Sequence, residues 1–342
     1  MTMTKPTYGL VLFATALALC VVILGAFTRL RDAGLGCPDW PGCYGHLTWP
    51  GTEEQIANAE ARFPEAPFEV HKAWPEVVHR YFAGTLGLVI IAISVLAWKN
   101  RDKPGQPLKL PLLLLALVIA QGLFGMWTVT LKLWPQVVTT HLLGGFTTLS
   151  LLWLLAQRLR NAPWPHPNVP LARWRALRPL AAAGLVLVVL QIALGGWTSS
   201  NYAALACPDL PTCQGHWWPP MDAKSGFDVF QEIGPNYLGG QLDGAARVAI
   251  HMGHRIGALV VLGSLCFLLM QLYRNAGGAA LRRQANVIAA LLAIQVCLGL
   301  SNVLWSLPLP VAVAHNAGGA LLLLSLVSLN YQLYKSCAGS HV

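Results

Sequence analysis

Long stretches without a charged residue run through most of this sequence. Each is close to the roughly 20 residues that an α-helix needs to cross the hydrocarbon core of a bilayer. They cover residues 6–28, 81–98, 110–131, 133–157, 179–208, 256–273 and 284–334. The last contains Pro308 and Pro310 near its middle, which predicts a hairpin of two helices. With 55% hydrophobic and 11% charged residues, the chain is expected to be an all-α integral membrane protein with eight transmembrane helices.

The charged residues orient the expected helices in the membrane. The two termini and three of the connections are rich in Lys and Arg, and Asp102 is their only acid. These basic connections are 99–109, 158–178 and 274–283. By the positive-inside rule they lie in the cytoplasm, whereas the long connections 29–80 and 201–255, which carry the other acids, lie outside. The net charge of +9 is therefore a signal of topology, and no nucleic-acid partner is expected.

The start of the chain agrees with a bacterial inner membrane. The first apolar stretch is too long for a cleavable signal peptide, and no Arg- and Ser-rich transit segment precedes it. We therefore expect a multi-pass protein of the inner (cytoplasmic) membrane, with both termini in the cytoplasm and the cysteine-containing loops in the periplasm.

The sequence contains two copies of one unit. Each copy has two cysteines, then a His-Arg pair and then a histidine followed by two glycines. In the first copy these are Cys37, Cys43, His79-Arg80 and His141, and in the second copy they are Cys207, Cys213, His254-Arg255 and His315. A repeat with four spans per unit keeps both units in the same orientation. We predict two repeated four-helix bundles, over 1–160 and 179–342, joined by a cytoplasmic linker over 161–178.

The four repeated histidines at the starts of apolar stretches are candidate ligands. A histidine inside the membrane is energetically expensive, so it indicates a function and a partner. Two imidazoles on facing helices of a bundle are a common way to hold a haem iron from both sides. The pattern predicts one pair in each unit, His79 with His141 and His254 with His315, all near the outer face. The alternative is that they are buried, hydrogen-bonded histidines, beside glycines that only let helices pack closely.

The residues four positions after the histidines favour the haem interpretation. A helical residue at i+4 lies on the same face as residue i. All four of these positions hold small residues, namely Ala83, Gly145, Ala258 and Gly319. Small residues there leave room for a flat porphyrin beside each ligand.

Four of the eight cysteines form two Cys-x5-Cys pairs in the outer connections. Because that compartment is oxidising, disulfides Cys37–Cys43 and Cys207–Cys213 are expected. Each would close a short ring, which stabilises a protein by roughly 2 kcal/mol in the chain-entropy model. A metal site made of Cys37, Cys43 and His46 is the alternative, although its spacing is not a usual zinc pattern.

The two units differ at one position beside the first histidine. Glu76 lies one helical turn before His79, on the same face, whereas His251 holds the matching place before His254. A carboxylate there could take up a proton or stabilise positive charge on a substrate, so Glu76 is the candidate catalytic residue. The alternative is that Glu76, which follows Pro75, is an acidic residue favoured by the dipole at the start of a helix.

Taken together, these motifs resemble the haem A synthase family of bacteria and mitochondria. The likeness runs over essentially the whole chain and includes both cysteine pairs, as in family members with four cysteines. It implies an oxidoreductase that converts the C8 methyl group of haem O to a formyl group, which gives haem A. The residues that it assigns are His254 and His315 as iron ligands of a haem b cofactor, His79 and His141 as residues that flank the substrate haem, and Glu76 as the catalytic carboxylate.

The runner-up function is a membrane di-haem b-type cytochrome that carries electrons and modifies no haem. It also explains four histidines, but it gives no reason for Glu76 or for unequal sites. A transporter would need a polar path near the middle of the membrane, which the charge-free stretches do not offer. The resemblance further implies a surrounding lipid bilayer, delivery of haem O by a haem O synthase and a membrane electron donor, and it leaves room for a homo-oligomer.

Overall fold

The computed structural model describes residues 5–103, 105–164 and 169–338. Its long helices are α1 (Lys5–Leu30), α3 (Val70–Lys99), α4 (Lys109–Thr130), α5 (Pro135–Arg160), α6 (Leu171–Ser200), α8 (Gly244–Arg274), α9 (Ala279–Leu304) and α10 (Leu309–Ala338). Two short helices, α2 (Glu53–Arg62) and α7 (Ala223–Gly226), lie in the connections after α1 and α6. All eight long helices are apolar and long enough to cross a membrane. This confirms the prediction of an all-α membrane protein with eight spans.

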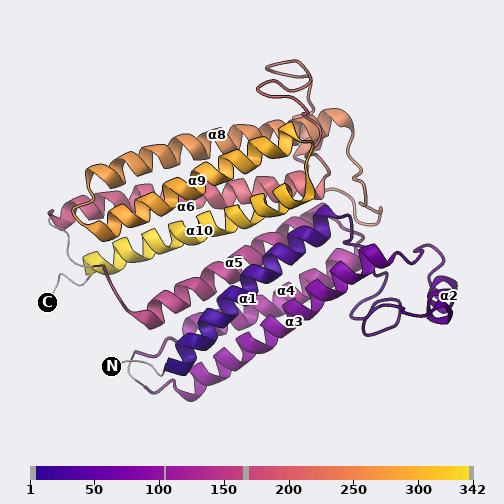
Figure 1. The fold of residues 1–342 in the computed structure, drawn as a ribbon, viewed down its shortest axis with the longest axis horizontal. Helices are drawn as coiled ribbons and strands as arrows, with labels where there is room; N and C mark the ends of the chain where they lie inside the picture. Colours follow the sequence, from indigo (N-terminus) through magenta and orange to yellow (C-terminus); the bar gives the residue numbers. More distant parts are fainter. Residues whose placement is uncertain (1–4, 104, 165–168, 339–342) are drawn as a thin grey trace.

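The eight long helices form two groups of four (Figure 1). In the first group, α1 and α4 each contact α3 and α5, so α3 and α5 lie diagonally opposite each other. In the second group, α6 and α9 each contact α8 and α10, so α8 and α10 form the diagonal pair. The two groups meet where α10 packs against α1 and α5, and where α5 packs against α6.

The apolar core is continuous through both groups. One cluster of buried residues includes Leu149 on α5, Leu265 on α8 and Leu326 on α10, all of them fully buried. At one end of the helices, Arg29 of the first group also donates a hydrogen bond to the backbone carbonyl of Ser199 in the second, at 2.5 Å. The two groups are therefore packed against each other along their length.

The helices after the outer connections begin earlier than the charge pattern predicts. α3 and α8 start well before the predicted ends of the connections 29–80 and 201–255. Each carries an arginine, Arg80 or Arg255, that the charge pattern assigns to the connection. These guanidinium groups are tolerated within the helices because backbone carbonyl groups of the connections accept their hydrogen bonds. A charge therefore does not mark the helix boundary here.

The linker between the groups is also shorter than predicted. The later part of the predicted linker 161–178 belongs to α6, because α6 begins at Leu171. Residues 165–168 of that linker lie outside the described residues. By contrast, the break predicted from Pro308 and Pro310 does separate α9 from α10.

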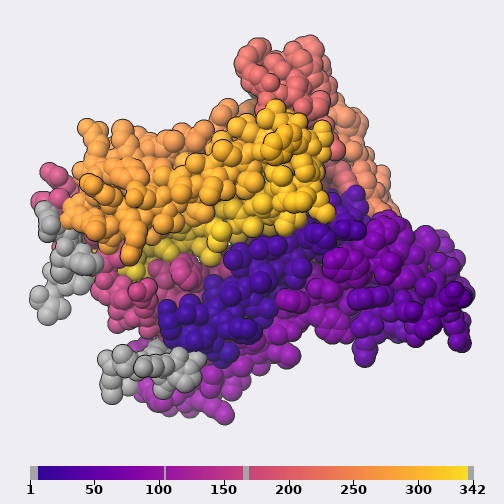
Figure 2. All heavy atoms as spheres, viewed as in Figure 1, coloured from indigo at the N-terminus to yellow at the C-terminus, as the bar shows by residue number. Residues whose placement is uncertain are grey.

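Both long outer connections lie at one end of the molecule, at the right in Figure 1. α1 begins and α10 ends at the opposite end. The first connection, 31–69, contains α2, and the second, 201–243, contains α7. Part of the second connection projects sideways from the helices, as Figure 2 shows. The candidate histidines lie on helices that start at this end of the molecule.

Candidate functional site

The four candidate histidines lie on the diagonal helices of the two groups. His79 is on α3 and His141 on α5, whereas His254 is on α8 and His315 on α10. Each lies in the first half of its helix, toward the end of the molecule that carries the outer connections. Within each group the two imidazoles are near enough to interact electrostatically. The structure thus places His79 near His141, and His254 near His315.

Each imidazole packs against a glycine on a neighbouring helix. A methyl group on that glycine would come within 2.9 to 3.3 Å of the ring carbon Cε1 in three of the pairs, closer than an ordinary contact, and would just touch the ring of His141 at 3.6 Å in the fourth. The four pairs are His79 with Gly25, His141 with Gly125, His254 with Gly195 and His315 with Gly299. These glycines repeat in the sequence, but the sequence does not show which ring each one faces. Each imidazole therefore has a small residue beside it on a neighbouring helix, in addition to the small residue four positions later on its own helix.

Three of the four imidazoles keep a buried ring nitrogen that has no hydrogen-bond partner within the described residues. These are Nδ1 of His79, His141 and His315. A buried polar group without a partner costs roughly 1–3 kcal/mol, so such atoms mark places where a bound group completes the site. Paired imidazoles of this kind fit the two axial ligands of a haem iron. In the described part of the chain, no cluster of three or more His, Cys, Asp or Glu could hold a bare metal ion.

In the second group, glutamine side chains contact both imidazoles. Nε2 of Gln191 on α6 lies 3.0 Å from Nδ1 of His254 and donates to the backbone carbonyl of His254 at 2.9 Å. Nε2 of Gln295 on α9 lies 3.3 Å from Nε2 of His315. A polar neighbour of this kind restricts the orientation of an imidazole ring. The protein itself therefore holds the imidazoles of the second group.

The first group lacks these contacts. The repeat places Val21 of α1 where the second group has Gln191. The side chain of valine has no polar group, and it is the backbone of Val21 that is a hydrogen-bond partner of His79. Gln121 of α4 matches Gln295, and both side chains pack against a glycine of the helix that carries the histidine, Gly144 on α5 or Gly318 on α10. In the described part of the chain, only Gln295 of these two also contacts an imidazole. Among the described residues, Nδ1 of neither His79 nor His141 has a hydrogen-bond partner. Within the described structure, no side chain therefore contacts an imidazole of the first group as Gln191 and Gln295 do in the second.

Glu76 is a buried carboxylate where α3 meets the first outer connection. It accepts a hydrogen bond from the backbone N–H of Cys37 at 3.0 Å, and it forms an ion pair with Arg80 one turn later on α3. Only 5% of the residue is exposed. Because α3 begins at Val70, Glu76 lies in the second turn, and its interpretation as a helix-start residue is wrong. A buried carboxylate one turn from His79 can exchange a proton or stabilise positive charge there.

His251 makes the matching contact in the second group. Its Nδ1 lies 3.0 Å from the backbone carbonyl of Ala203, in the connection that follows α6. It is as buried as Glu76. Both residues therefore tie the second long helix of their group to the preceding outer connection. Only in the first group does this contact bring a carboxylate next to the histidine pair.

Disulfides close both cysteine loops, Cys37 with Cys43 and Cys207 with Cys213. This confirms the predicted pairing. It also overturns the alternative metal site, because both of its thiols are used in a disulfide. His46 instead pairs through its backbone with Cys43, with N–H to carbonyl distances of 2.9 and 3.0 Å.

The arginine that follows the first histidine of each group holds the adjacent cysteine loop. Arg80 donates to the backbone carbonyl groups of Asp39, Pro41 and Gly42. Arg255 donates to those of Cys207, Asp209 and Thr212, each at 2.8 Å. This explains the His-Arg pair in both copies, because the histidine faces a neighbouring helix of its group while the arginine binds the loop.

A carboxylate inside each cysteine loop stabilises its turn. Asp39 accepts hydrogen bonds from the backbone N–H groups of Tyr44 and Gly45, and Asp209 accepts them from those of Gln214 and Gly215. The hydroxyl group of Thr212, together with these backbone N–H groups, lowers the pKa of Asp209 to about 2. Asp209 is therefore a charged acceptor for this turn at any physiological pH.

The second outer connection also contacts the first group. Its backbone carbonyl groups at Gln231 and Val229 accept hydrogen bonds from the side chains of Trp134 and Gln136, both at 3.0 Å. These two donors lie at the start of α5, shortly before His141. A loop of the second group thus covers the outer end of a helix that carries a histidine of the first.

Comparison with known proteins places this arrangement in a family. Residues 8–327 match the family model COX15-CtaA, described as cytochrome oxidase assembly protein. The chain is 47% identical over 325 residues to the haem A synthase of Shewanella oneidensis, which covers 95% of this chain and 96% of the relative. It is 26% identical to the haem A synthase of Rhizorhabdus wittichii, over 95% of this chain and 93% of the relative. For the haem A synthase of Maricaulis maris the identity is 29%, with 93% of each chain covered.

The family match includes both helix groups, all four histidines and both cysteine loops. The Shewanella oneidensis relative matches over nearly the full length of both chains. The protein therefore belongs to the COX15-CtaA family of cytochrome oxidase assembly proteins.

Proposed function

We propose that this protein is a haem A synthase, an oxidoreductase that converts the C8 methyl group of haem O to a formyl group. The observation that carries this proposal is the 47% identity to the haem A synthase of Shewanella oneidensis over 95% of the chain. The geometry supports a protein that handles two haems, because each helix group holds a pair of imidazoles against glycines. If the protein were an electron carrier with two permanent haems, the difference between the two histidine pairs would have no explanation.

The two histidine pairs then have different tasks. The proposal assigns haem b to His254 and His315 of the second unit as a resident cofactor, and haem O to His79 and His141 of the first unit as the substrate. The support is the way in which the imidazoles are held. A resident cofactor benefits from ligands that are fixed before it binds, because less freedom is lost on binding. A substrate has to leave after each turnover, so ligands with weaker support suit its site.

Glu76 is the proposed catalytic residue. Its carboxylate can take a proton from the methyl group during oxidation or stabilise positive charge that develops there. Arg80 and the backbone N–H of Cys37 fix its position next to the first histidine pair. When bound, haem b would supply one-electron redox chemistry. No other described carboxylate occupies the corresponding place, since His251 stands there in the second group.

The proposal also includes the setting of the protein. It is a multi-pass membrane protein, and we place it in the bacterial inner membrane with both termini cytoplasmic and the cysteine loops periplasmic. The basic connections support this orientation, as do the disulfides, which need an oxidising compartment. Haem O would arrive from a haem O synthase, and a membrane component would exchange electrons. A homo-oligomer is compatible with this arrangement.

The test is to produce the protein in cells that make haem O but have no haem A synthase of their own. Extracted haems are identified by mass spectrometry, and the purified protein is examined by pyridine haemochrome analysis. We expect haem A only in cells that contain the protein, and haem b together with haem O or haem A in the purified protein. Haem b in both sites, with no haem A formed, would contradict the proposal and identify an electron carrier.

A further inference from the structure

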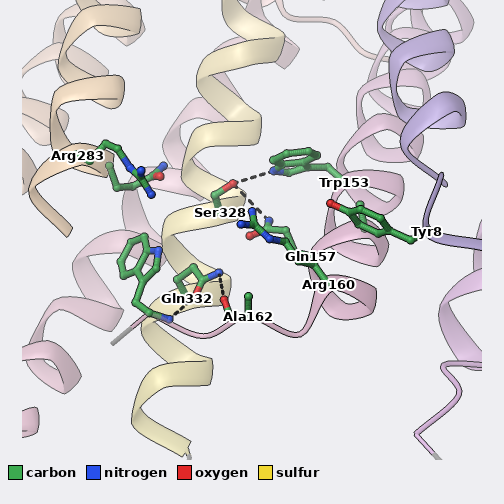
Figure 3. Close-up of a pocket in the computed structure, with 11 residues that line it drawn as sticks. Tyr8, Trp153, Gln157, Arg160, Ala162, Arg283, Ser328 and Gln332 are labelled. Atoms are coloured by element: carbon green, nitrogen blue, oxygen red, sulfur yellow. Dashed lines mark hydrogen bonds between the residues drawn. The ribbon is translucent and has the colours of Figure 1, made fainter. Parts of the chain in front are cut away.

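A cavity lined by polar and aromatic side chains lies between the two helix groups, at the end of the molecule opposite to the cysteine loops (Figure 3). Its volume is about 170 Å³. The first group lines it from the start of α1, the end of α5 and the connection after α5. The second group lines it from α9 and α10. The cavity is therefore far along the helices from both histidine pairs and plays no part in either.

Two guanidinium groups line this cavity, one from each helix group. Arg160 is the last residue of α5, and Arg283 lies near the start of α9. Within the part of the chain that the structure describes, no acidic residue lines the cavity and neither arginine forms an ion pair with a carboxylate. Like charges held at one seam repel each other. The cavity therefore favours an anion, which the described residues do not supply.

The neutral walls of the cavity are held by hydrogen bonds across the seam. Trp153 and Gln157 of α5 both donate to the hydroxyl group of Ser328 on α10, at 2.7 and 3.3 Å. Gln332 of α10 donates to the backbone carbonyl of Ala162 at 3.3 Å (Figure 3). These bonds use neutral groups and leave both guanidinium groups available. The cavity is thus formed before any ligand binds, as is usual for ligand sites.

The position of the cavity points to a lipid. In the proposed orientation it lies at the cytoplasmic surface of the membrane, where Tyr8, Trp153 and Trp164 supply the aromatic rings common at this level. Basic pockets between transmembrane helices on this side bind anionic headgroups. Guanidinium groups bind phosphate oxygens in a bidentate manner, and acyl chains can lie along the apolar helices. We propose that the cavity binds the phosphate group of an anionic phospholipid, which joins the two helix groups.

The proposal is tested by native mass spectrometry of the purified, haem-loaded protein in detergent, titrated with dioctanoyl phosphatidylglycerol. Dioctanoyl phosphatidylcholine and inorganic phosphate are the comparison ligands. We expect phosphatidylglycerol to bind to the wild type, and Arg160→Gln and Arg283→Gln each to weaken its binding about tenfold, because each removes charge-assisted hydrogen bonds. The lysine variants Arg160→Lys and Arg283→Lys keep the charge but lose the bidentate geometry, so their affinities should be intermediate.

Arg282→Gln is the matched control, since Arg282 is adjacent on α9 but does not line this cavity. It should bind phosphatidylglycerol as the wild type does. An unchanged haem spectrum verifies that each variant is folded. Equal binding by the wild type and the double Arg160→Gln, Arg283→Gln variant would overturn the proposal, and so would an equal loss in Arg282→Gln. Inorganic phosphate that binds as tightly as the lipid would identify a soluble anion as the ligand instead.

Discussion

The two helix groups carry the same arrangement of histidines but support it differently. In the second group the side chains of Gln191 and Gln295 contact the imidazoles, whereas in the described structure no glutamine makes such a contact with His79 or His141 of the first group. At the place where the first group has Glu76, the second has His251, which contacts only a backbone carbonyl. A repeated unit can thus keep its ligands and change only the residues around them.

This comparison separates two properties of a haem site. The paired imidazoles and the glycines beside them are common to both groups, so they can account for haem binding as such. The proposed function assigns different haem retention and different chemistry to the two groups. These differences would then depend on residues that touch the proposed ligands or lie one turn away. Gln191 and Glu76 are the clearest examples, and variants at these positions test whether they account for the difference between the groups.

The largest expected effect follows from removing a ligand. His254→Ala and His315→Ala should each abolish the low-spin spectrum of haem b, because each removes one of the two proposed axial ligands in the second group. His79→Ala and His141→Ala should leave this spectrum in place and prevent the conversion of haem O. Optical and electron paramagnetic resonance spectra of the purified variants measure the difference. An unchanged bis-histidine spectrum in His254→Ala or His315→Ala would contradict the assignment, and His251 would be the next candidate.

The next largest effect concerns the carboxylate that only the first group has. Glu76→Gln should lower the conversion of haem O to haem A by about 10²-fold or more, the usual contribution of a positioned acid–base or charged group. Haem b should remain bound. The amide oxygen can still accept the N–H of Cys37, so the variant removes the charge and keeps the attachment of the loop. Activity is measured as haem A formed per haem b present.

The matched control for this variant is His251→Gln. It changes the repeat-related position, which holds the second outer connection through the carbonyl of Ala203. It should alter the environment of haem b without blocking the binding of haem O in the first group. If Glu76→Gln and the wild type turned over equally, Glu76 would be only an anchor for the first cysteine loop.

The membrane architecture could be predicted from the sequence because hydrophobicity and charge act over whole stretches. Eight spans, the hairpin at Pro308 and Pro310 and both disulfides follow from patterns of that kind. The starts of α3 and α8 could not be predicted in the same way. Arg80 and Arg255 look like the ends of loops, but loop carbonyl groups satisfy them inside the helices.

The residues that contact the candidate histidines were harder to predict from the sequence than the histidines themselves. The histidines repeat and begin apolar stretches, so they can be recognised one by one. The contact of Gln191 with His254 joins residues that are 63 positions apart in the sequence, and it depends on how α6 is rotated against α8. The glycines beside the rings pose the same problem, since a repeated glycine does not reveal which helix it faces. Only the packing of the helices supplies this information.

A smaller effect is expected at the glutamine that distinguishes the second group. Gln191→Val copies the residue of the first group and should release haem b about tenfold faster, because residues that orient a histidine ligand typically contribute 10–100-fold to metal affinity. The rate is measured by transfer of haem to an excess of apomyoglobin. The midpoint potential of haem b should also shift, which it would not do if Gln191 only filled space.

The reciprocal variant is Val21→Gln in the first group. It should hold His79 more firmly, so that haem O or haem A stays bound longer and turnover slows by a few-fold. Gln191→Val and Val21→Gln thus make the two groups more alike at this position, so their rates of haem release should also become more alike. Equal haem release in all three proteins would show that the glutamine does not set retention, and the assignment of cofactor and substrate would lose its main structural support.

The smallest effect is expected from the disulfides. In the unreduced protein none of Cys37, Cys43, Cys207 and Cys213 should react with a thiol reagent, and stoichiometric labelling at any of them would contradict the observed pairs. Replacement of either pair by serine should weaken haem retention only modestly. Each ring is short, which limits its contribution to roughly 2 kcal/mol, and Arg80 or Arg255 still holds the loop through its carbonyl groups.

The two disulfides nevertheless allow a final comparison between the groups. The backbone N–H of Cys37 donates to Glu76, whereas in the second loop the matching contact of His251 goes to Ala203, outside the disulfide ring. Loosening the first ring should therefore disturb the carboxylate and lower turnover by a few-fold, while loosening the second should leave turnover nearly unchanged. Haem A formation by the double variants Cys37→Ser, Cys43→Ser and Cys207→Ser, Cys213→Ser measures this difference. A larger loss from the second pair would mean that the loops act through the histidine sites in general and not through Glu76.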